Sequence, residues 1–335
     1  MKLSILDQSP ISKGSNAVEA LQHMEQSVLL AEELGYHRFW MAEHHNTVGF
    51  SSSAPEISIA SMAAKTKRIR LGSGGVMMMH YSPYKLAEVF KTLSAYAPGR
   101  IDFGVGRAPG GDNRTIYAMQ EGRPPMIDDM YGKLQTILQL MADENPEDEI
   151  YHNMIAQPTG IHLPEAWLLG SSGNSAVQAG RMGLGYSYAQ FFNGHLDKAV
   201  IDTYKSNFIP SVYMPEPKVM VSYFVTVAET AEEAAYQALP SDISRMLLMR
   251  GKIDLRMSPE EAKDYPLTGI EKAIMEQQVG WHIKGTVKEV ADKLLEEQAY
   301  YGFDEAMICT IPYAQEYKLK EYKLLAEALI SLDES

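Results

Sequence analysis

A chain of 335 residues with 45% hydrophobic and 22% charged residues has the composition of a globular protein, and it is long enough for one large α/β barrel or two ordinary domains. Its 43 acidic and 30 basic residues give a formal net charge of −13, which repels phosphate backbones and argues against nucleic acids and anionic membranes as partners. Its single cysteine, Cys309, excludes an intramolecular disulfide framework and a cysteine-based zinc or iron–sulfur cluster.

The beginning of the sequence lacks the features of a targeting segment. Residues Met1 to Pro10 alternate polar and apolar side chains, without the basic and apolar regions of a secretory signal peptide. No run of residues approaches the roughly 18 apolar positions that a transmembrane helix needs. We therefore expect a cytoplasmic protein.

Short runs of β-forming residues alternate with longer segments of helical periodicity, which is the pattern of βαβ units and a parallel sheet. Several runs are almost continuously apolar, as buried parallel strands are. Eight such units form a closed barrel more economically than an open sheet, so we predict an α/β protein with a (β/α)8 TIM-barrel fold. The predicted strands are Leu3–Gln8, Arg38–Glu43, Ile69–Met77, Ile101–Val105, Ala166–Gly170, Gly185–Gln190, Lys218–Ala228 and Glu305–Thr310.

Boundary residues mark four of the helices between these strands. Gly35 follows the first, proline begins the second and third, and Thr286 with Glu289 forms a capping box at the start of the last. The four helices are Ala17–Leu34, Pro55–Lys65, Pro83–Tyr96 and Thr286–Tyr301.

The chain shows no linker or break in composition, so we predict a single barrel domain over residues 1–335. Residues 241–284 do not fit one strand–helix unit and are predicted to form an insertion between strands seven and eight, on the face where insertions often act as lids. Because catalytic groups of barrel enzymes lie where the strands end, the motifs that follow the strands are the candidates for function.

The second predicted strand ends in Glu43-His44-His45, three potential metal ligands. Consecutive residues at a strand end point in alternating directions, so Glu43 and His45 face one way and His44 the other, which argues against a shared metal. A histidine directed into the barrel mouth is a candidate for proton transfer, because its ordinary pKa of about 6.5 is easily tuned. On this motif alone, a structural role for His44 is equally well supported.

Two glycine-containing turns follow the third and fourth strands. Gly72-Ser73-Gly74-Gly75 favours close approach of the backbone to a flat ligand over simple loop flexibility. Gly104-Val105-Gly106 does not complete a dinucleotide-binding fingerprint, since proline stands at position 109. The next residue, Arg107, suits bidentate binding of a phosphate, with a surface salt bridge as the equal alternative.

The fifth strand leads into Gly170-Ser171-Ser172-Gly173-Asn174-Ser175 and then into a helical segment. Free backbone N–H groups, serine hydroxyls and the helix dipole converge in such a turn, where an anion binds favourably. Helix capping explains one serine but not the whole run, so we predict a phosphate cradle here.

The sequence resembles the bacterial-luciferase-like flavin monooxygenases over essentially its whole length, and most closely in its first 110 residues. The similarity lies in the order and spacing of three motifs, Trp40 to His45, Arg70 to Val76 and Gly99 to Arg107. Gly285-Thr286 followed by Val290-Ala291-Asp292 is similar to the last crossover helix of that family.

The resemblance implies an enzyme that uses reduced FMN and O2, receives the flavin from a separate flavin reductase and oxidises its substrate through a C4a-peroxyflavin. It implies a cis peptide between Gly74 and Gly75 under the flavin ring, next to Val76, and it places His44 beside the flavin as the catalytic residue. It also implies that the flavin phosphate is bound by Arg107 and by Gly170, Ser171 and Ser172, although the family's serine-rich turn matches these last residues more loosely.

Two alternatives to this function stay open: an F420-dependent oxidoreductase of the same barrel family, which transfers hydride, and a non-catalytic flavin-binding protein. The resemblance also implies a homo-oligomer, a dimer or a tetramer, and the apolar stretches Ala54–Met62 and Val76–Met79 are the predicted contacts. The substrate is a small molecule whose identity the sequence does not give, because fold analogy does not supply it.

Overall fold

The computed structural model describes residues 1–123, 129–252, 254–277 and 279–330. Within these ranges eight parallel strands close into a barrel in the order β1-β2-β3-β4-β5-β6-β7-β9. The closing contacts are parallel pairings of β1 with β9 and of β7 with both β6 and β9. The predicted TIM barrel is therefore confirmed. The barrel strands are β1 (Lys2–Asp7), β2 (Arg38–Met41), β3 (Arg70–Ser73), β4 (Ile101–Val105), β5 (Glu165–Gly170), β6 (Gly185–Ala189), β7 (Val219–Ala228) and β9 (Glu305–Cys309).

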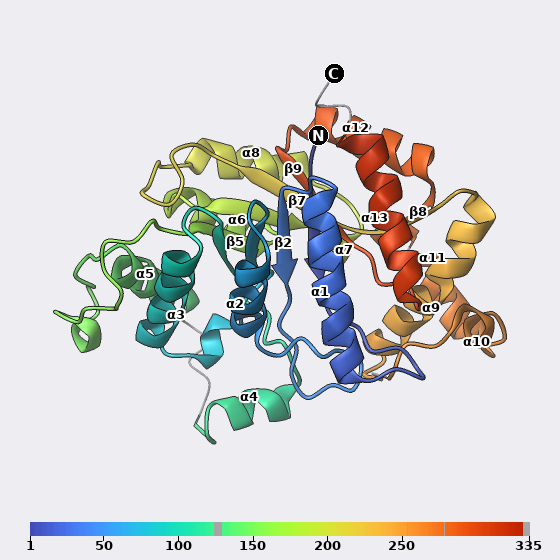
Figure 1. The fold of residues 1–335 in the computed structure, drawn as a ribbon, viewed down its shortest axis with the longest axis horizontal. Helices are drawn as coiled ribbons and strands as arrows, with labels where there is room; N and C mark the ends of the chain where they lie inside the picture. Colours follow the sequence, from blue (N-terminus) through green and yellow to red (C-terminus); the bar gives the residue numbers. More distant parts are fainter. Residues whose placement is uncertain (124–128, 253, 278, 331–335) are drawn as a thin grey trace.

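Helices cover the outside of the barrel (Figure 1). The four predicted helices begin and end within one position of the predicted residues, and Thr286 accepts from the backbone N–H of Glu289 as the predicted capping box requires. The α-helices are α1 (Ala17–Glu33), α2 (Pro55–Lys65), α3 (Pro83–Tyr96), α4 (Asn113–Met119), α5 (Met130–Met141), α6 (Gly173–Arg181), α7 (Gln190–Asn193), α8 (Lys198–Asn207), α9 (Ala231–Met249), α10 (Pro259–Lys263), α11 (Gly269–Gln277), α12 (Val287–Tyr301) and α13 (Gln315–Leu329), and the 3-10 turns are η1 (Met78–His80), η3 (Glu149–Tyr151) and η4 (Val279–Trp281).

Alternation along the strands divides the core into two layers. In β2, Phe39 packs with the apolar side chains between barrel and helices, while its neighbour Trp40 packs inside the barrel. The interior cluster joins Trp40 to Trp167, whose rings meet edge to face with centroids 5.8 Å apart. Both tryptophans are at most 1% exposed, so side chains fill the interior and the barrel is not a pore.

The strand beginnings, at the N-terminal face of the barrel, carry a buried network of charges. Arg38 bonds Asp102 at 2.7 Å and Glu305 at 2.8 Å, and Arg70 bonds the other oxygen of Asp102 at 2.9 Å. Burial acts to raise the pKa of Glu165, but the charges of Arg38, Arg70 and Lys218 outweigh it and lower that pKa to about 2. Cations and carboxylates thus neutralise one another across several strands.

The third strand is shorter than predicted. It ends at Ser73 instead of Met77, because the chain turns at a cis peptide between Gly74 and Gly75 and enters a 3-10 turn. Val76 makes an isolated parallel bridge with Val105, and its backbone N–H donates to Gly104 at 2.9 Å. The apolar residues after Ser73 pack in the core although they do not lie in a strand: Val76 and Met78 are at most 1% exposed.

The insertion between the seventh and eighth barrel strands is confirmed, but it contains a strand that the sequence analysis missed. This strand, β8 (His282–Thr286), pairs in parallel with the second half of β7, from Phe224 to Ala228. The inserted segment also starts earlier than predicted, because α9 already begins at Ala231. Helices α9 to α11 form a lobe on one side of the barrel in Figure 1 and pack around a small cluster of Ile243, Met246, Met257 and Ala262.

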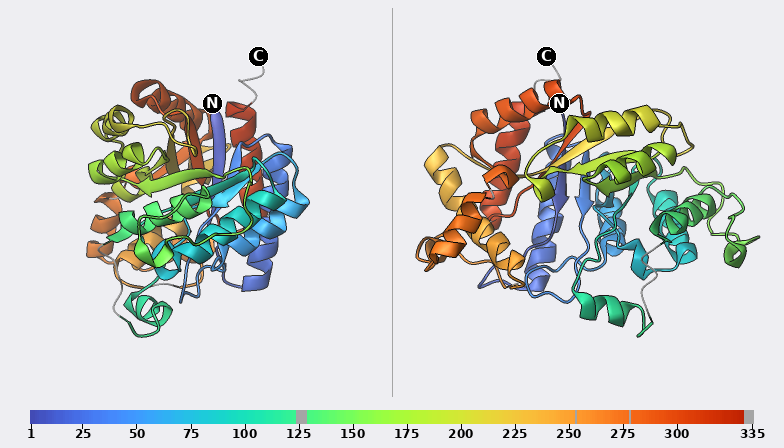
Figure 2. Two further views of the ribbon diagram at one scale, coloured as in Figure 1. Left: turned by 90° about the vertical axis from the view of Figure 1, so that its left-hand side faces the viewer. Right: turned by 180° about the vertical axis from the view of Figure 1, so that it is seen from behind.

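The loops that follow the strands gather at the face opposite to the chain termini, which lie at the top of Figure 1. Helix α4 stands away from the body of the barrel at this face in both views of Figure 2. In the described parts of the chain, every helix is too short or too polar to span a membrane.

Candidate active site

His44 lies just beyond the end of β2, between the barrel mouth and the loop that follows. Its backbone N–H donates to the carbonyl of Ser52 at 2.7 Å, and its ring stacks on Phe50 with centroids 4.5 Å apart. Burial, reinforced by the neighbouring His45, lowers the pKa of His44 to about 4, so the imidazole is neutral at pH 7. Its buried Nδ1 has no hydrogen-bond partner among the described residues, which leaves this atom able to bind something else.

Glu43 and His45 point the other way, as predicted for alternate residues. His45 Nε2 lies 2.7 Å from Glu43 Oε1, and the same carboxylate accepts from the Tyr81 hydroxyl at 2.6 Å and the Met77 backbone N–H at 2.8 Å. Glu43 is completely buried and thus holds the loop after β3 against β2. Across the described residues, no group of three or more histidine, cysteine or acidic side chains is arranged to hold a metal.

The Gly74–Gly75 step is packed tightly between neighbouring strands. A Cβ atom on Gly74 would lie 2.5 Å from Leu6 Cδ1, and one on Gly75 would lie 2.9 Å from the carbonyl oxygen of Gly104. The packing of the barrel itself therefore requires both glycines. Gly74 is nevertheless partly exposed, so its backbone is accessible at the end of the strand.

Arg107 follows β4 and is exposed, and it makes no hydrogen bond or ion pair with any residue that the structure describes. The surface salt bridge considered for it is thus not formed. Gly106, just before it, packs on the end of β5, where a Cβ atom would lie 3.5 Å from Leu169 Cβ. The free guanidinium group consequently lies next to the strand that leads into the serine-rich turn.

The serine-rich turn after β5 forms the start of α6. Ser172 is the N-cap, and its backbone N–H donates to Ser175 Oγ at 3.3 Å. Ser175 is buried and bonds the Tyr186 hydroxyl at 3.0 Å, while Ser171 is partly exposed and Ser172 exposed. Gly170 is required here, since a Cβ atom would lie 2.3 Å from Ser175 Oγ. Two of the three serines therefore remain accessible at a helix N-terminus.

Tyr131, which the sequence analysis did not single out, links the two halves of this site. Its hydroxyl accepts from Asn174 Nδ2 at 3.4 Å, in the first turn of α6. Burial raises the pKa of Tyr131, and the positive charge of Arg107 acts in the opposite direction, which places the guanidinium group near this ring. Arg107 and the start of α6 therefore both lie near Tyr131. Nothing in the sequence of α5 indicates this bridging role.

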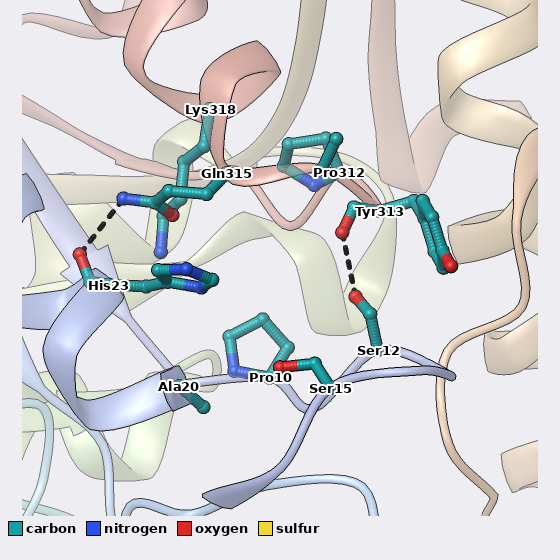
Figure 3. A pocket seen from close by; sticks show the side chains of 10 residues that line it. Pro10, Ser12, Ser15, Ala20, His23, Pro312, Tyr313, Gln315 and Lys318 are labelled. Atoms are coloured by element: carbon teal, nitrogen blue, oxygen red, sulfur yellow. Dashed lines mark hydrogen bonds between the residues drawn. The ribbon is translucent and has the colours of Figure 1, made fainter. Parts of the chain in front are cut away.

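A small cavity lies away from these candidate residues, between the loop after β1 and the start of α13 (Figure 3). Its volume is about 50 Å³, well below the roughly 300–1,000 Å³ of typical ligand pockets. Its polar groups already bond one another: Gln315 donates to the His23 carbonyl at 3.0 Å, Ser12 donates to the Tyr313 carbonyl at 2.7 Å, and Lys318 pairs with Asp7. This cavity is too small and too well satisfied to hold a flavin.

One of the two stretches predicted to join subunits lies in the core. Val76, Met77 and Met78 are at most 8% exposed, so they offer no apolar surface to a second copy. In the other stretch, Ile57 on α2 is 66% exposed, while Ile59 and Met62 are buried. Of the two stretches predicted to join subunits, α2 alone therefore offers a largely exposed apolar side chain, Ile57, to a second copy.

The residues at the barrel mouth fit FMN as a ligand. A free guanidinium and the exposed serines at a helix N-terminus match a single phosphate. The partly exposed backbone of Gly74 and the unpaired Nδ1 of His44 lie at the ends of the strands next to it. A flat ring with polar edges fits such a surface.

Comparison with known proteins agrees with this geometry. The family model of luciferase-like monooxygenases matches residues 1–311. The N-acetyl-S-alkylcysteine monooxygenase of Bacillus subtilis is 37% identical over 335 residues, covering 99% of each chain.

Solved structures show the same fold. The structure of apo-MsnO8 superposes with a TM-score of 0.89 at 34% identity and covers 98% of both chains. The oxygenating constituent of 3,6-diketocamphane monooxygenase from Pseudomonas putida, solved in complex with FMN, superposes with a TM-score of 0.70 at 18% identity and covers 98% of both chains. The second likeness concerns the fold alone.

Proposed function

The chain belongs to the luciferase-like monooxygenase family, and from this premise we propose that it binds reduced FMN at the barrel mouth and uses O2 to oxygenate a small organic substrate. One observation carries the proposal: Arg107 has no partner among the described residues, and its charge acts on Tyr131, which bonds Asn174 in the first turn of α6. When bound, reduced FMN supplies the electrons that activate O2.

In this proposal Arg107, Gly170, Ser171 and Ser172 hold the phosphate. The guanidinium group of Arg107 would supply the positive charge, and the backbone N–H groups and the hydroxyls of Ser171 and Ser172 at the start of α6 would donate hydrogen bonds to the phosphate. Tyr131 bonds Asn174 and feels the charge of Arg107, so it connects the two parts of the cradle.

Gly74, Gly75 and Val76 form the support for the flavin ring. Leu6 and the carbonyl of Gly104 fill the space behind the two glycines, so this backbone has little room to move away from a ring placed on it. The bridge between Val76 and Val105 holds the residue that follows the glycine step against the end of β4. A rigid support of this kind orients a ligand without charged side chains.

His44 has the role of a proton carrier beside the ring. Because its pKa is about 4, it stays neutral at pH 7, with one ring nitrogen carrying a proton and the other able to accept one. The stacking on Phe50 and the hydrogen bond of its backbone to Ser52 hold the imidazole in place. His44 can therefore donate a hydrogen bond, or pass a proton, at the edge of the flavin.

The proposal extends to the surroundings of the enzyme. A separate flavin reductase supplies reduced FMN, as the resemblance to the family implies. We also propose a cytoplasmic, homo-oligomeric protein with its barrel in one domain over residues 1–335, and an insertion that covers the mouth as a lid. A monomeric mass measured by light scattering at micromolar concentration would contradict the proposed homo-oligomer.

The decisive experiment is an anaerobic titration of the purified protein with oxidised and reduced FMN, FAD and F420. Tight binding of reduced FMN, followed by O2 uptake when a reductase supplies it, is the expected result. Substrate screening then starts with N-acetyl-S-alkylcysteines, since a relative of 37% identity carries that name, and continues with aldehydes, alkanes and sulfonates. Preference for F420 or flavin binding without O2 uptake would contradict the proposal.

A further inference from the structure

Two arginines from the insertion bind backbone carbonyls of the segments that follow β6 and β9 at the barrel mouth. Arg245, on α9, donates to the carbonyl of Phe191 at 2.5 Å, and its guanidinium group lies 3.6 Å from the centroid of the Trp281 ring. Arg256, after α9, donates to Ser241 Oγ at 2.8 Å and to the carbonyl of Ile311. Ser241 and Arg245 lie one helical turn apart, so both arginines meet one face of α9.

The place where they meet is the floor of the mouth. Ile311, whose carbonyl Arg256 binds, belongs with Cys309 to the apolar cluster inside the barrel, and Phe191, whose carbonyl Arg245 binds, packs against that cluster. The same interior cluster includes Phe224 and Leu6, and Leu6 is the side chain that backs Gly74. The arginines and the proposed flavin support therefore border one apolar floor.

Neither arginine has an acidic partner of its own in the described chain. Arg256 is 5% exposed, and its guanidinium group donates only to the neutral oxygen atoms of Ser241 and Ile311 among the described residues. Asp242 lies near Arg245, but its two oxygens are bonded to His282 at 2.6 Å and to Lys284 at 2.5 Å. The Nε atoms of Arg245 and Arg256 are both buried, and neither has a hydrogen-bond partner among the residues that the structure describes.

This arrangement is unusual for a protein with a net charge of −13. Buried cations are normally paired with carboxylates, because an unpaired buried charge with an unmade hydrogen bond is costly. The N-terminal face of the same barrel follows that rule with Arg38 and Arg70. At the mouth no described residue bonds a carboxylate to either of these guanidinium groups, and a ligand that carries one would complete the pair.

We propose that Arg245 and Arg256 form the anion subsite for the substrate, and that the substrate is a small organic carboxylate whose apolar part lies on the floor of the mouth toward the flavin support. This inference deepens the proposed function and rests on it. A planar carboxylate matches the fork of a guanidinium group, and Trp281 keeps the fork of Arg245 in one plane. Phe191 and Phe224 supply the aromatic surface for the rest of the molecule.

The test compares two probes that differ in charge alone, 3-(benzylthio)propanoate and 3-(benzylthio)propanamide, by calorimetry on flavin-free and FMN-saturated full-length protein. We expect the carboxylate to bind at least about tenfold more tightly than the amide. Arg245→Gln should abolish this preference and leave amide binding unchanged, while Arg245→Lys, which keeps the charge without the fork, should restore part of it.

Arg250→Gln is the matched control, because Arg250 ends the same helix and pairs with Glu271 away from the mouth. It should keep the full preference. Arg256→Gln should act as Arg245→Gln does, and if it fails to fold, the Arg245 variants decide the question alone.

Three results would overturn the proposal: equal affinity of the two probes for the parent protein, an unchanged preference in Arg245→Gln, or a loss of FMN affinity in Arg245→Gln that equals the loss of carboxylate affinity. The last result would assign the arginines to the flavin. Failure of the proposed function is recognised separately, since it appears as absent FMN binding in the parent protein, whereas the flavin-free titration tests the arginines directly.

Discussion

The two ends of this barrel treat charge in opposite ways. At the N-terminal face, Arg38 and Arg70 bond Asp102, and Glu165 and Glu305 complete a buried network with closely matched partners. At the mouth, polar groups lack partners among the described residues: His44 Nδ1 and the Nε atoms of Arg245 and Arg256 are buried and unbonded, and Arg107 is free. One face satisfies its own charges, and the other leaves donors available to a ligand.

The difference indicates which face carries stability and which carries function. Barrels place catalysis at the C-terminal ends of strands and stability at the opposite end. Here the same residue type, arginine, occurs at both ends, so its surroundings and not its identity separate the two roles. Substitutions at the N-terminal face should therefore lower stability, and substitutions at the mouth should lower ligand binding or turnover.

The largest effect is expected at the N-terminal face. Arg38→Met leaves Glu305 buried without its cation and Asp102 with Arg70 alone, which costs about 3–5 kcal/mol of unfolding free energy. Urea unfolding of the flavin-free protein measures this loss. Lys288→Met is the matched control, because it removes an exposed helical pair with Asp292 and should leave the urea midpoint unchanged. An unchanged urea midpoint in Arg38→Met would mean that the network does not stabilise the fold.

His44→Ala should affect turnover far more than stability or flavin binding. A positioned proton-transfer group contributes roughly 100- to 10,000-fold, so substrate oxygenation should fall by that range while hydrogen peroxide is released from reduced FMN and O2. The affinity for reduced FMN should change little. The exposed His162→Ala should behave as the parent. Identical product yield in His44→Ala and parent would make His44 structural.

In that case the acid–base group would have to be sought elsewhere. Glu43 is fully buried and accepts from three donors, and Tyr188 is fully buried with its hydroxyl 3.5 Å from the His195 carbonyl. The Tyr188 hydroxyl has fewer partners than the Glu43 carboxylate, so Tyr188 would be the next variant to measure.

Arg107→Ala should weaken binding of reduced FMN roughly tenfold to a hundredfold, since a charge-assisted contact to phosphate is worth about 1.5–3 kcal/mol. Stability in the absence of flavin should stay within about 0.5 kcal/mol, because Arg107 is exposed and bonds no described residue. Arg181→Ala, at the far end of α6, is the control for net charge. Equal flavin affinity in the two variants would remove Arg107 from the phosphate site.

The smallest effect concerns pH. The pKa of His44 is lowered from 6.5 to about 4 in the folded protein, so the unfolded chain binds more protons between these values. The folded state therefore loses stability as pH falls from 6.5 toward 4, by about 1–2 kcal/mol after allowance for solvent screening. His44→Gln should remove this part of the loss when flavin-free proteins are unfolded in urea at pH 7 and pH 4.5. An equal loss of unfolding free energy between pH 7 and pH 4.5 in the parent and in His44→Gln would mean that His44 is exposed to solvent.

The barrel could be predicted because its strands are local patterns, and the motifs after β2 to β5 were found because strand ends of a barrel meet at one face. β8 was missed because His282 to Thr286 mixes charged, small and apolar residues and pairs only with the end of β7 beyond the barrel. Arg245 and Arg256 were missed because their importance depends on the partners they lack, and a sequence does not show a missing partner. Tyr131 was missed because its contact with Asn174 joins residues 43 positions apart.

The low reactivity expected of Cys309 allows a second, introduced cysteine to be labelled selectively. It is the single cysteine of the chain, it is 1% exposed, and burial, together with the charge of Asp7, raises the pKa of its thiol to about 12 against the opposing charges of Lys318, Arg256 and Arg245. A thiol of this kind has almost no thiolate at neutral pH and reacts slowly with maleimides. A cysteine introduced on the surface of α10 or α11 would thus carry a fluorophore or spin label alone, and movements of the insertion could be recorded without first replacing the native cysteine.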